Sequence, residues 1–358
     1  MSRCSKGSRN LPTFLNRLKL AAQSRPHGRP HRRSRHFRPH LAAAAIAAGL
    51  AATTVSAESL AQPKDNVLER QAASYIRFRE DVAAIEAMPF NNAEVTREAH
   101  RRLAAHNTDA LSAGWVAYAA LVAADQPAFA EAIEHEIEKK GNRRKGELGG
   151  VDGLLSSMAQ DPAFLRNLPG ADDAVNAVLA MTVQDGARIT ELGEAFKTQA
   201  YAMQKTSWGK QKISPSQSRI DEAATYSRSR GAPAAPVLVR AENNGVLAPA
   251  LASARGEWSA DWGAGADQGK MTEKNAEVII DRILNLAARY STGSLNPKIV
   301  EAYAMNTKSE RCLSMAKLTL DQCIAATRAP YEEAFCLGEH GLKDIATCTG
   351  WIAGAGAS

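Results

Sequence analysis

The sequence lacks the short motifs that mark several common enzyme classes. It contains no glycine-rich phosphate loop and no Gly-x-Ser-x-Gly nucleophile turn. The absence of such motifs does not exclude catalysis, but it lowers the expectation of a nucleotide-dependent enzyme or an α/β-hydrolase. We therefore expect a protein that works by binding or scaffolding.

Strand patterns are also nearly absent. Only Val237–Val239 reads as extended, and three residues are too few to found a sheet. Apolar residues instead recur at helical spacing through most of the chain after residue 63, most strongly in 109–124, which includes Leu111, Trp115 and Leu121. The pattern predicts an all-α fold.

A change of composition divides this helical part of the chain. Residues 214–270 become polar and then rich in Ala, Gly and Pro, which is typical of a linker or mobile excursion. So long a linker within one compact domain would be unusual. The sequence therefore predicts a bundle-like helical domain at 63–213 and a C-terminal helical domain at 271–354, which contains a cysteine hairpin.

Acidic residues are missing from the first 57 positions, which carry 11 Lys and Arg. Within this leader, basic residues at 32–38 precede an uncharged, Ala-rich stretch at 41–55. Val55-Ser56-Ala57 then fits the small-x-small cleavage pattern. Residues 1–57 are predicted to be a signal peptide, and the exported product would begin at Glu58.

Two features of the leader stay open. Arg32-Arg33 leaves both the general secretory and the twin-arginine export route possible, whereas the clean apolar block argues against a mitochondrial transit peptide. No Met lies between Met1 and Met88, so translation could start later, at another codon.

Removal of the leader changes the charge of the protein. The full chain has a net charge of +6, but the residues after position 57 hold 33 basic and 38 acidic side chains, a net charge of −5. A mildly acidic product has no electrostatic basis for binding nucleic acid. Charges interrupt its longer apolar segments, so we expect no membrane span after cleavage.

Four cysteines are placed almost symmetrically about Pro330. If 309–328 is one helix, Cys312 and Cys323 lie about 16 Å apart along its axis, too far to bond to each other. A chain reversal near Pro330 would bring Cys336 opposite Cys323, and Cys348 opposite Cys312. The spacing predicts a helical hairpin with these two nested disulfides.

The second helix of this hairpin has a phase problem. Cys336 and Cys348 are 12 residues apart, which places them about 120° out of phase on a straight α-helix. Gly338 and Gly341 would correct this by a kink, or would break the helix and allow a Cys336–Cys348 bond. Zinc binding is disfavoured because no Cys-x-x-Cys pair is present, and Cys4 lies in the leader.

The arrangement resembles the twin-cysteine helical hairpins of the coiled coil–helix type, which carry paired cysteines about ten residues apart. The resemblance covers only residues 312–348 and implies no function.

Three residues are candidates for ligand binding. Trp258 and Trp262 lie on either side of Asp261 in the glycine-rich segment. Aromatic side chains beside a carboxylate are typical of sugar-binding or peptide-binding sites. Alternatively, the two tryptophans dock this segment onto a neighbouring helix. His340, between two glycines, is either a proton shuttle or ligand, or a residue that packs on the hairpin or caps a helix.

Two clusters of His and Glu are interpreted as solvated helix faces. The first comprises Glu131, Glu134, His135 and Glu138, which match no metal-binding helix motif. A looser set comprises Glu98, His100 and His106. We therefore predict no metal and no cofactor.

These observations predict an exported helical binding or scaffolding protein of the bacterial cell envelope, periplasmic or secreted. Its partner would be an envelope protein or polymer. The alternative is a helical hydrolase acting on envelope polymers, with Glu and His as acid and base. An enzyme should join perturbed carboxylates from distant segments in one cleft, whereas a binding protein should present an apolar or aromatic site without one.

Overall fold

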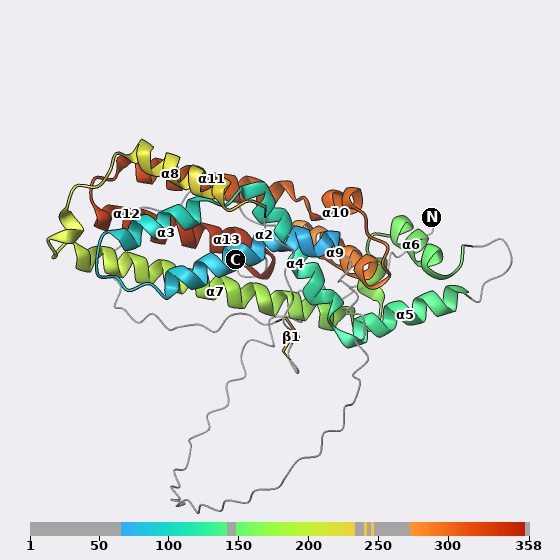
Figure 1. Ribbon diagram of the computed structural model, residues 1–358. Helices are drawn as coiled ribbons and strands as arrows, with labels where there is room; N and C mark the ends of the chain where they lie inside the picture. The colour runs from blue at the N-terminus through green and yellow to red at the C-terminus, as the bar shows by residue number, and fades with distance from the viewer. Residues whose placement is uncertain (1–65, 142–147, 233–239, 242–244, 247–272, 355–358) are drawn as a thin grey trace, which may run out of the picture. The chain divides into compact units, whose positions relative to one another are not determined.

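The computed structural model describes residues 66–141, 148–232, 240–241, 245–246 and 273–354, and it confirms the all-α fold (Figure 1). The candidate ligands Trp258 and Trp262, the short extended stretch 237–239 and most of the predicted linker lie outside the described residues. The elements are α2 (Val67–Glu86), α3 (Glu94–Ala104), α4 (Thr108–Ala124), α5 (Pro127–Gly141), α6 (Gly150–Gln160), η1 (Phe164–Asn167), α7 (Ala171–Met203), η2 (Trp208–Lys210), α8 (Ser216–Ser229), β1 (Arg240–Ala241), β2 (Gly245–Val246), α9 (Glu273–Ser291), α10 (Pro297–Ala304), α11 (Thr307–Ala326), α12 (Pro330–Cys336), the π-helical turn η3 (Leu337–Lys343) and α13 (Asp344–Gly354).

Asparagine side chains begin four of these helices. The Oδ1 atoms of Asn66, Asn107, Asn296 and Asn306 each accept a hydrogen bond from a backbone N–H in the first turn, at 2.8–3.0 Å. Such caps satisfy N–H groups that have no partner within the helix. Local sequence therefore sets where α2, α4, α10 and α11 start.

Helix α4 forms the centre of the core. Its residues from Leu111 to Ala123 are all buried, and it packs against α2, α9, α11 and α7. Gly114 permits the closest of these approaches, because a Cβ at this position would lie 2.8 Å from the backbone nitrogen of Tyr75 on α2. The apolar stretch predicted at 109–124 is thus a helix enclosed on all sides by protein.

The two predicted helical domains share this core. The described helices from α2 to α13 form one compact unit, in which α9 packs on α4, and η3 and α13 pack on α7. The helices before and after residues 214–270 therefore pack into one hydrophobic core, although the composition changes between them. Part of the predicted linker is helical: α8 lies within it and packs against α3 and α11.

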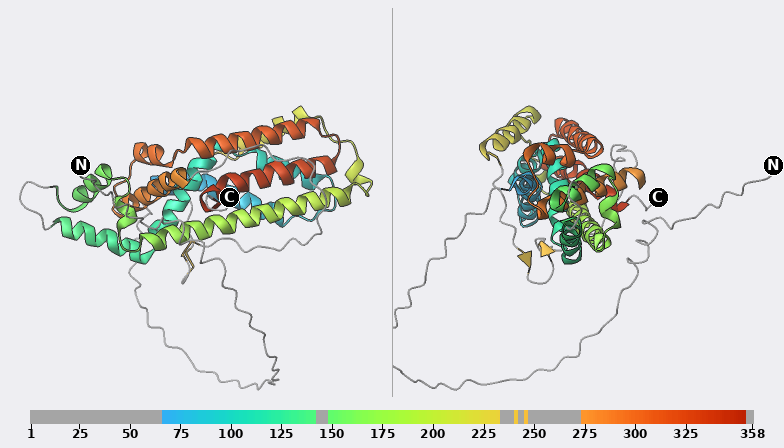
Figure 2. Two further views of the ribbon diagram at one scale, coloured as in Figure 1. Left: turned by 180° about the vertical axis from the view of Figure 1, so that it is seen from behind. Right: turned by 90° about the vertical axis from the view of Figure 1, so that its right-hand side faces the viewer.

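Helix α7 runs unbroken alongside the α12–α13 segment, with α8 and α11 on the far side of that segment from α7 (Figures 1 and 2). Gly186 and Gly193 do not divide it. Gly193 instead faces Gly338 of η3, and a Cβ on either glycine would lie within 2.7 Å of the other's carbonyl oxygen. These two glycines allow the backbones of α7 and η3 to touch.

Buried ion pairs fix α7 against its neighbours. Asp185 lies 3.1 Å from Arg79 of α2, and Lys197 lies 2.7 Å from Glu339 of η3. A buried charge without its partner is costly, so each pair disfavours a shifted register more than it adds net stability. The polar contacts therefore select one alignment of α7.

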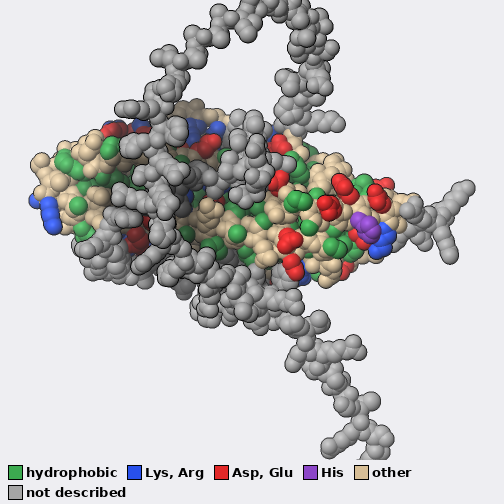
Figure 3. Space-filling view, turned by 90° about the horizontal axis from the view of Figure 1, so that it is seen from below, with side chains coloured by type: hydrophobic (Ala, Val, Ile, Leu, Met, Phe, Trp, Pro, Cys, Tyr) green, Lys and Arg blue, Asp and Glu red, His purple; other side chains and the backbone are tan. Residues whose placement is uncertain are grey.

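Among the described residues, no helix is long and apolar enough to cross a bilayer. On the face shown in Figure 3, hydrophobic side chains lie scattered among polar and acidic ones and do not gather into one patch. Scattered exposure of this kind is normal for a protein surface.

Candidate functional site: an apolar pocket beside the inner disulfide

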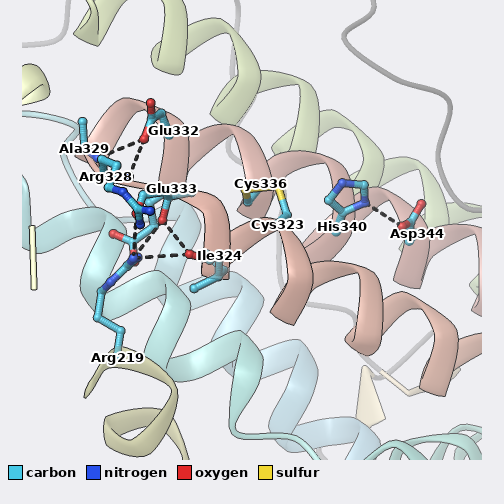
Figure 4. Close-up of a disulfide and its surroundings, with 11 residues drawn as sticks. Arg219, Cys323, Ile324, Arg328, Ala329, Glu332, Glu333, Cys336, His340 and Asp344 are labelled. Atoms are coloured by element: carbon cyan, nitrogen blue, oxygen red, sulfur yellow. Dashed lines mark hydrogen bonds and ion pairs between the residues drawn. A yellow bond between two sulfur atoms is a disulfide. The ribbon is translucent and has the colours of Figure 1, made fainter. Parts of the chain in front are cut away.

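The structure contains the nested disulfides predicted from the spacing. Cys312 bonds Cys348 across α11 and α13. Cys323 bonds Cys336 across α11 and α12, as Figure 4 shows. The outer bond is buried, whereas Cys323 of the inner bond is half-exposed. Two structural disulfides are typical of proteins that mature in an oxidising compartment.

The π-helical turn η3 resolves the phase problem between Cys336 and Cys348. A π-turn closes i→i+5 hydrogen bonds where an α-turn closes i→i+4 bonds, so it accommodates one extra residue in a turn. With one residue absorbed by the π-turn, the 12-residue spacing places Cys336 and Cys348 as an 11-residue spacing would on an α-helix. Eleven residues make three turns and about 20°, so the two cysteines point in nearly the same direction. The helical segment therefore continues without a break from α12 through η3 to α13, and both cysteines bond to α11.

The first turn of α12 is held by two adjacent glutamates with different partners (Figure 4). Glu332 accepts hydrogen bonds from the backbone N–H groups of Arg328 and Ala329, and from the Tyr331 hydroxyl at 3.0 Å. Glu333 is buried and accepts from Arg219 at 2.7 Å and Thr96 at 2.8 Å. Together they fix the chain reversal at Pro330.

A pocket of about 230 Å³ opens between α7, α11 and α12, beside the inner disulfide. Its walls are mostly apolar. They include the rings of Tyr201, Tyr331 and Phe335 and both sulfur-bearing residues of the inner bond. The remaining wall residues are Ala200, Gln204, Ala326, Thr327 and Glu332.

A polar hollow of about 410 Å³ lies on the Glu333 side of α12. Arg219 and Glu333 line this hollow, and each residue exposes no more than 2% of its surface. Arg219 also donates to the Thr327 hydroxyl and the Ser214 carbonyl, so the donors and acceptors of the pair are engaged within the protein. This pair therefore anchors α8 to the hairpin and is not poised for a ligand.

His340 lies on η3, away from the apolar pocket. Its Nδ1 atom is 3.0 Å from the Asp344 carboxylate one turn later, and both side chains are mostly buried. In the described structure, His340 thus packs within the hairpin.

The expected surface position of His100 and His106 is wrong. His100 is buried between α3, α8 and α11, its Nε2 atom has no hydrogen-bond partner, and burial lowers its pKa to about 4. His106 bonds the buried carboxylate of Asp81 at 2.8 Å. By contrast, the α5 set is solvent-facing, and His135 is exposed.

Two carboxylates with raised pKa values lie elsewhere. Burial raises the pKa of Asp185, which sits between Arg79 and Tyr75 in the core. Burial also raises the pKa of Asp281 on α9 to about 6, although Arg166 lies 2.7 Å away. Neither residue lines the apolar pocket or the polar hollow, so neither of these two cavities contains one of these carboxylates.

The pocket could not be found from the sequence, because its walls come from residues more than 100 positions apart. The Cys323–Cys336 pairing gave the only signal, since it placed α11 beside α12. Among the described residues, no group of three or more His, Cys, Asp or Glu side chains could hold a metal ion.

No protein-family model, no curated protein and no solved structure matches this chain.

Proposed function

We propose that this chain is an exported helical binding or scaffolding protein of the bacterial cell envelope, which receives an apolar group of its partner in the pocket beside the inner disulfide. One observation carries the proposal: the pocket is mostly apolar and is lined by three aromatic rings. Ligand sites are commonly concave and apolar, with a few polar groups that set orientation.

The construction of the pocket supports binding without large rearrangement. The inner disulfide and the Glu332 cap hold α12, and the Lys197–Glu339 pair holds α7 against η3. A wall fixed in this way loses little conformational entropy when a ligand binds. The oxidising compartment implied by the disulfides, together with the leader, supports periplasmic or secreted placement.

A pocket-filling substitution tests the proposal. Ala326 lines the pocket and Ala325 does not, although both are exposed on the same helix turn. We expect Ala326→Trp to abolish recovery of a specific partner from envelope extracts by the immobilised protein, while Ala325→Trp recovers it as the wild type does. Equal recovery by both variants would show that the pocket is not the binding site.

The same preparations test the hydrolase alternative. Incubation with isolated envelope polymers should release no soluble fragments if the protein only binds. Release that both tryptophan variants retain would instead favour catalysis elsewhere on the surface.

A further inference from the structure

The aromatic walls of the pocket share one electrostatic property. Tyr201 comes from α7, and Tyr331 and Phe335 come from α12, where they are four residues apart and so lie on one helix face. The face of an aromatic ring carries partial negative charge and attracts cations. Three such rings around one pocket form the kind of surface that encloses an alkylated ammonium group.

A carboxylate in the same wall strengthens this preference. In the described structure, Glu332 accepts hydrogen bonds from neutral donors: the N–H groups of Arg328 and Ala329 and the hydroxyl of Tyr331. Within the described part of the chain, no Lys, Arg or His forms an ion pair with it. Its negative charge at the edge of the apolar cavity is therefore held by hydrogen bonds and is not neutralised by a cationic side chain.

The cations already near the pocket do not cancel this field. Lys197 Nζ lies 5.8 Å from the centre of the Phe335 ring, but its charge is balanced by Glu339 at 2.7 Å. The Arg328 guanidinium points to the carbonyl of Thr327. The Lys197 contact also shows that the Phe335 ring accepts a cation in this fold.

Size and wall chemistry define the ligand further. A water molecule needs roughly 10–15 Å³ of such space, so a pocket of about 230 Å³ holds a group of many atoms. One carboxylate with engaged oxygens is a poor site for a metal ion, which needs several oxygen ligands. Alkyl groups on the ammonium would instead fill the space against Ala200, Ala326 and the disulfide.

We propose that the pocket binds an organic ammonium ion, with its charge directed to Glu332 and its alkyl groups against the aromatic rings. This inference rests on the proposed function, because it names the ligand class of the same pocket. The shared chemistry is the alkylated ammonium group, whether it occurs on a free small molecule or on a lipid headgroup.

The experiment compares choline with 3,3-dimethylbutan-1-ol, a neutral compound of the same shape. Titrations followed by saturation-transfer NMR should show choline binding at least fivefold more tightly to the oxidised protein. Glu332→Gln keeps a hydrogen-bond acceptor for the cap, and Phe335→Leu keeps an apolar wall. Each should reduce the choline preference at least threefold, whereas Glu301→Gln, an exposed position on α10, should leave it unchanged.

The outcomes separate the two proposals. Equal binding of both compounds overturns the ammonium assignment and leaves the pocket as an apolar site. A choline preference that survives Glu332→Gln and Phe335→Leu also overturns it. Binding of neither compound and of no phosphatidylcholine vesicle overturns it as well, and the proposed function then depends on the comparison of Ala326→Trp with Ala325→Trp. Vesicles of phosphatidylcholine that bind the wild type but not Glu332→Gln, when free choline does not bind, would assign the group to a lipid headgroup.

Discussion

Removing the two disulfides separately should destabilise the protein unequally, and the outer bond should matter more. Cys312–Cys348 spans 36 residues and Cys323–Cys336 spans 13. Loop-closure entropy in the unfolded chain then gives about 4 kcal/mol for the outer bond and about 3 kcal/mol for the inner bond. Burial increases the difference, because serine at positions 312 and 348 would place two hydroxyls in the core, whereas position 323 is half-exposed.

The assay is urea unfolding without reductant, followed by far-ultraviolet circular dichroism. The variants are Cys312→Ser with Cys348→Ser, and Cys323→Ser with Cys336→Ser, so that neither leaves an unpaired thiol. We expect the outer double variant to lose at least 1 kcal/mol more unfolding free energy than the inner one. Because α7 packs on both η3 and α4, each variant should still unfold in one transition.

An inner double variant that is as destabilised as the outer one, or more so, would refute this reasoning. It would mean that the inner bond stabilises the folded state directly, by a route other than loop closure. Wild-type protein unfolded with reductant serves as the control, and it should be less stable than either variant.

Two further predictions concern the core. Gly338→Ala should destabilise the protein by about 1–3 kcal/mol in the same urea assay, because its Cβ would lie 2.5 Å from the Gly193 carbonyl oxygen. Gly350→Ala is the control and should be nearly neutral, because a Cβ at position 350 has no neighbour within 4 Å. His100 has a pKa of about 4 when folded, below its usual 6.5, so the unfolded chain binds more protons between these values and stability falls as pH falls. Lowering the pH from 7 to 4 should therefore cost the wild type about 3 kcal/mol more than His100→Gln, and an equal loss in the two proteins would show that His100 does not titrate in this way.

Local features of the fold were predictable from the sequence. The apolar run of α4 and the cysteine spacing each depend on residues within one or two helices, and the structure confirms both. The burial of His100 was not predictable, because it follows from the arrival of α8 and α11, more than 100 positions later. The π-turn was equally hidden: the 12-residue spacing showed that a correction was needed but not which kind.

The candidate site shows the same limit. Glu332 and Phe335 could be placed on α12 from the sequence, but their meeting with Tyr201 depends on how α7 lies against the hairpin. That alignment is set by Lys197 with Glu339 and by the contact of Gly193 with Gly338. Neither pairing can be recognised from the local sequence, since each joins positions about 140 residues apart.

The nested disulfides also determine what a protease can release. A single cut between Cys312 and Cys348 leaves both pieces joined by the outer bond, and a cut between Cys323 and Cys336 leaves them joined by two. A nicked molecule would therefore keep its mass on a non-reducing gel and separate into fragments only when reduced. In an environment rich in proteases, the C-terminal hairpin can lose the continuity of its backbone and still remain one molecule.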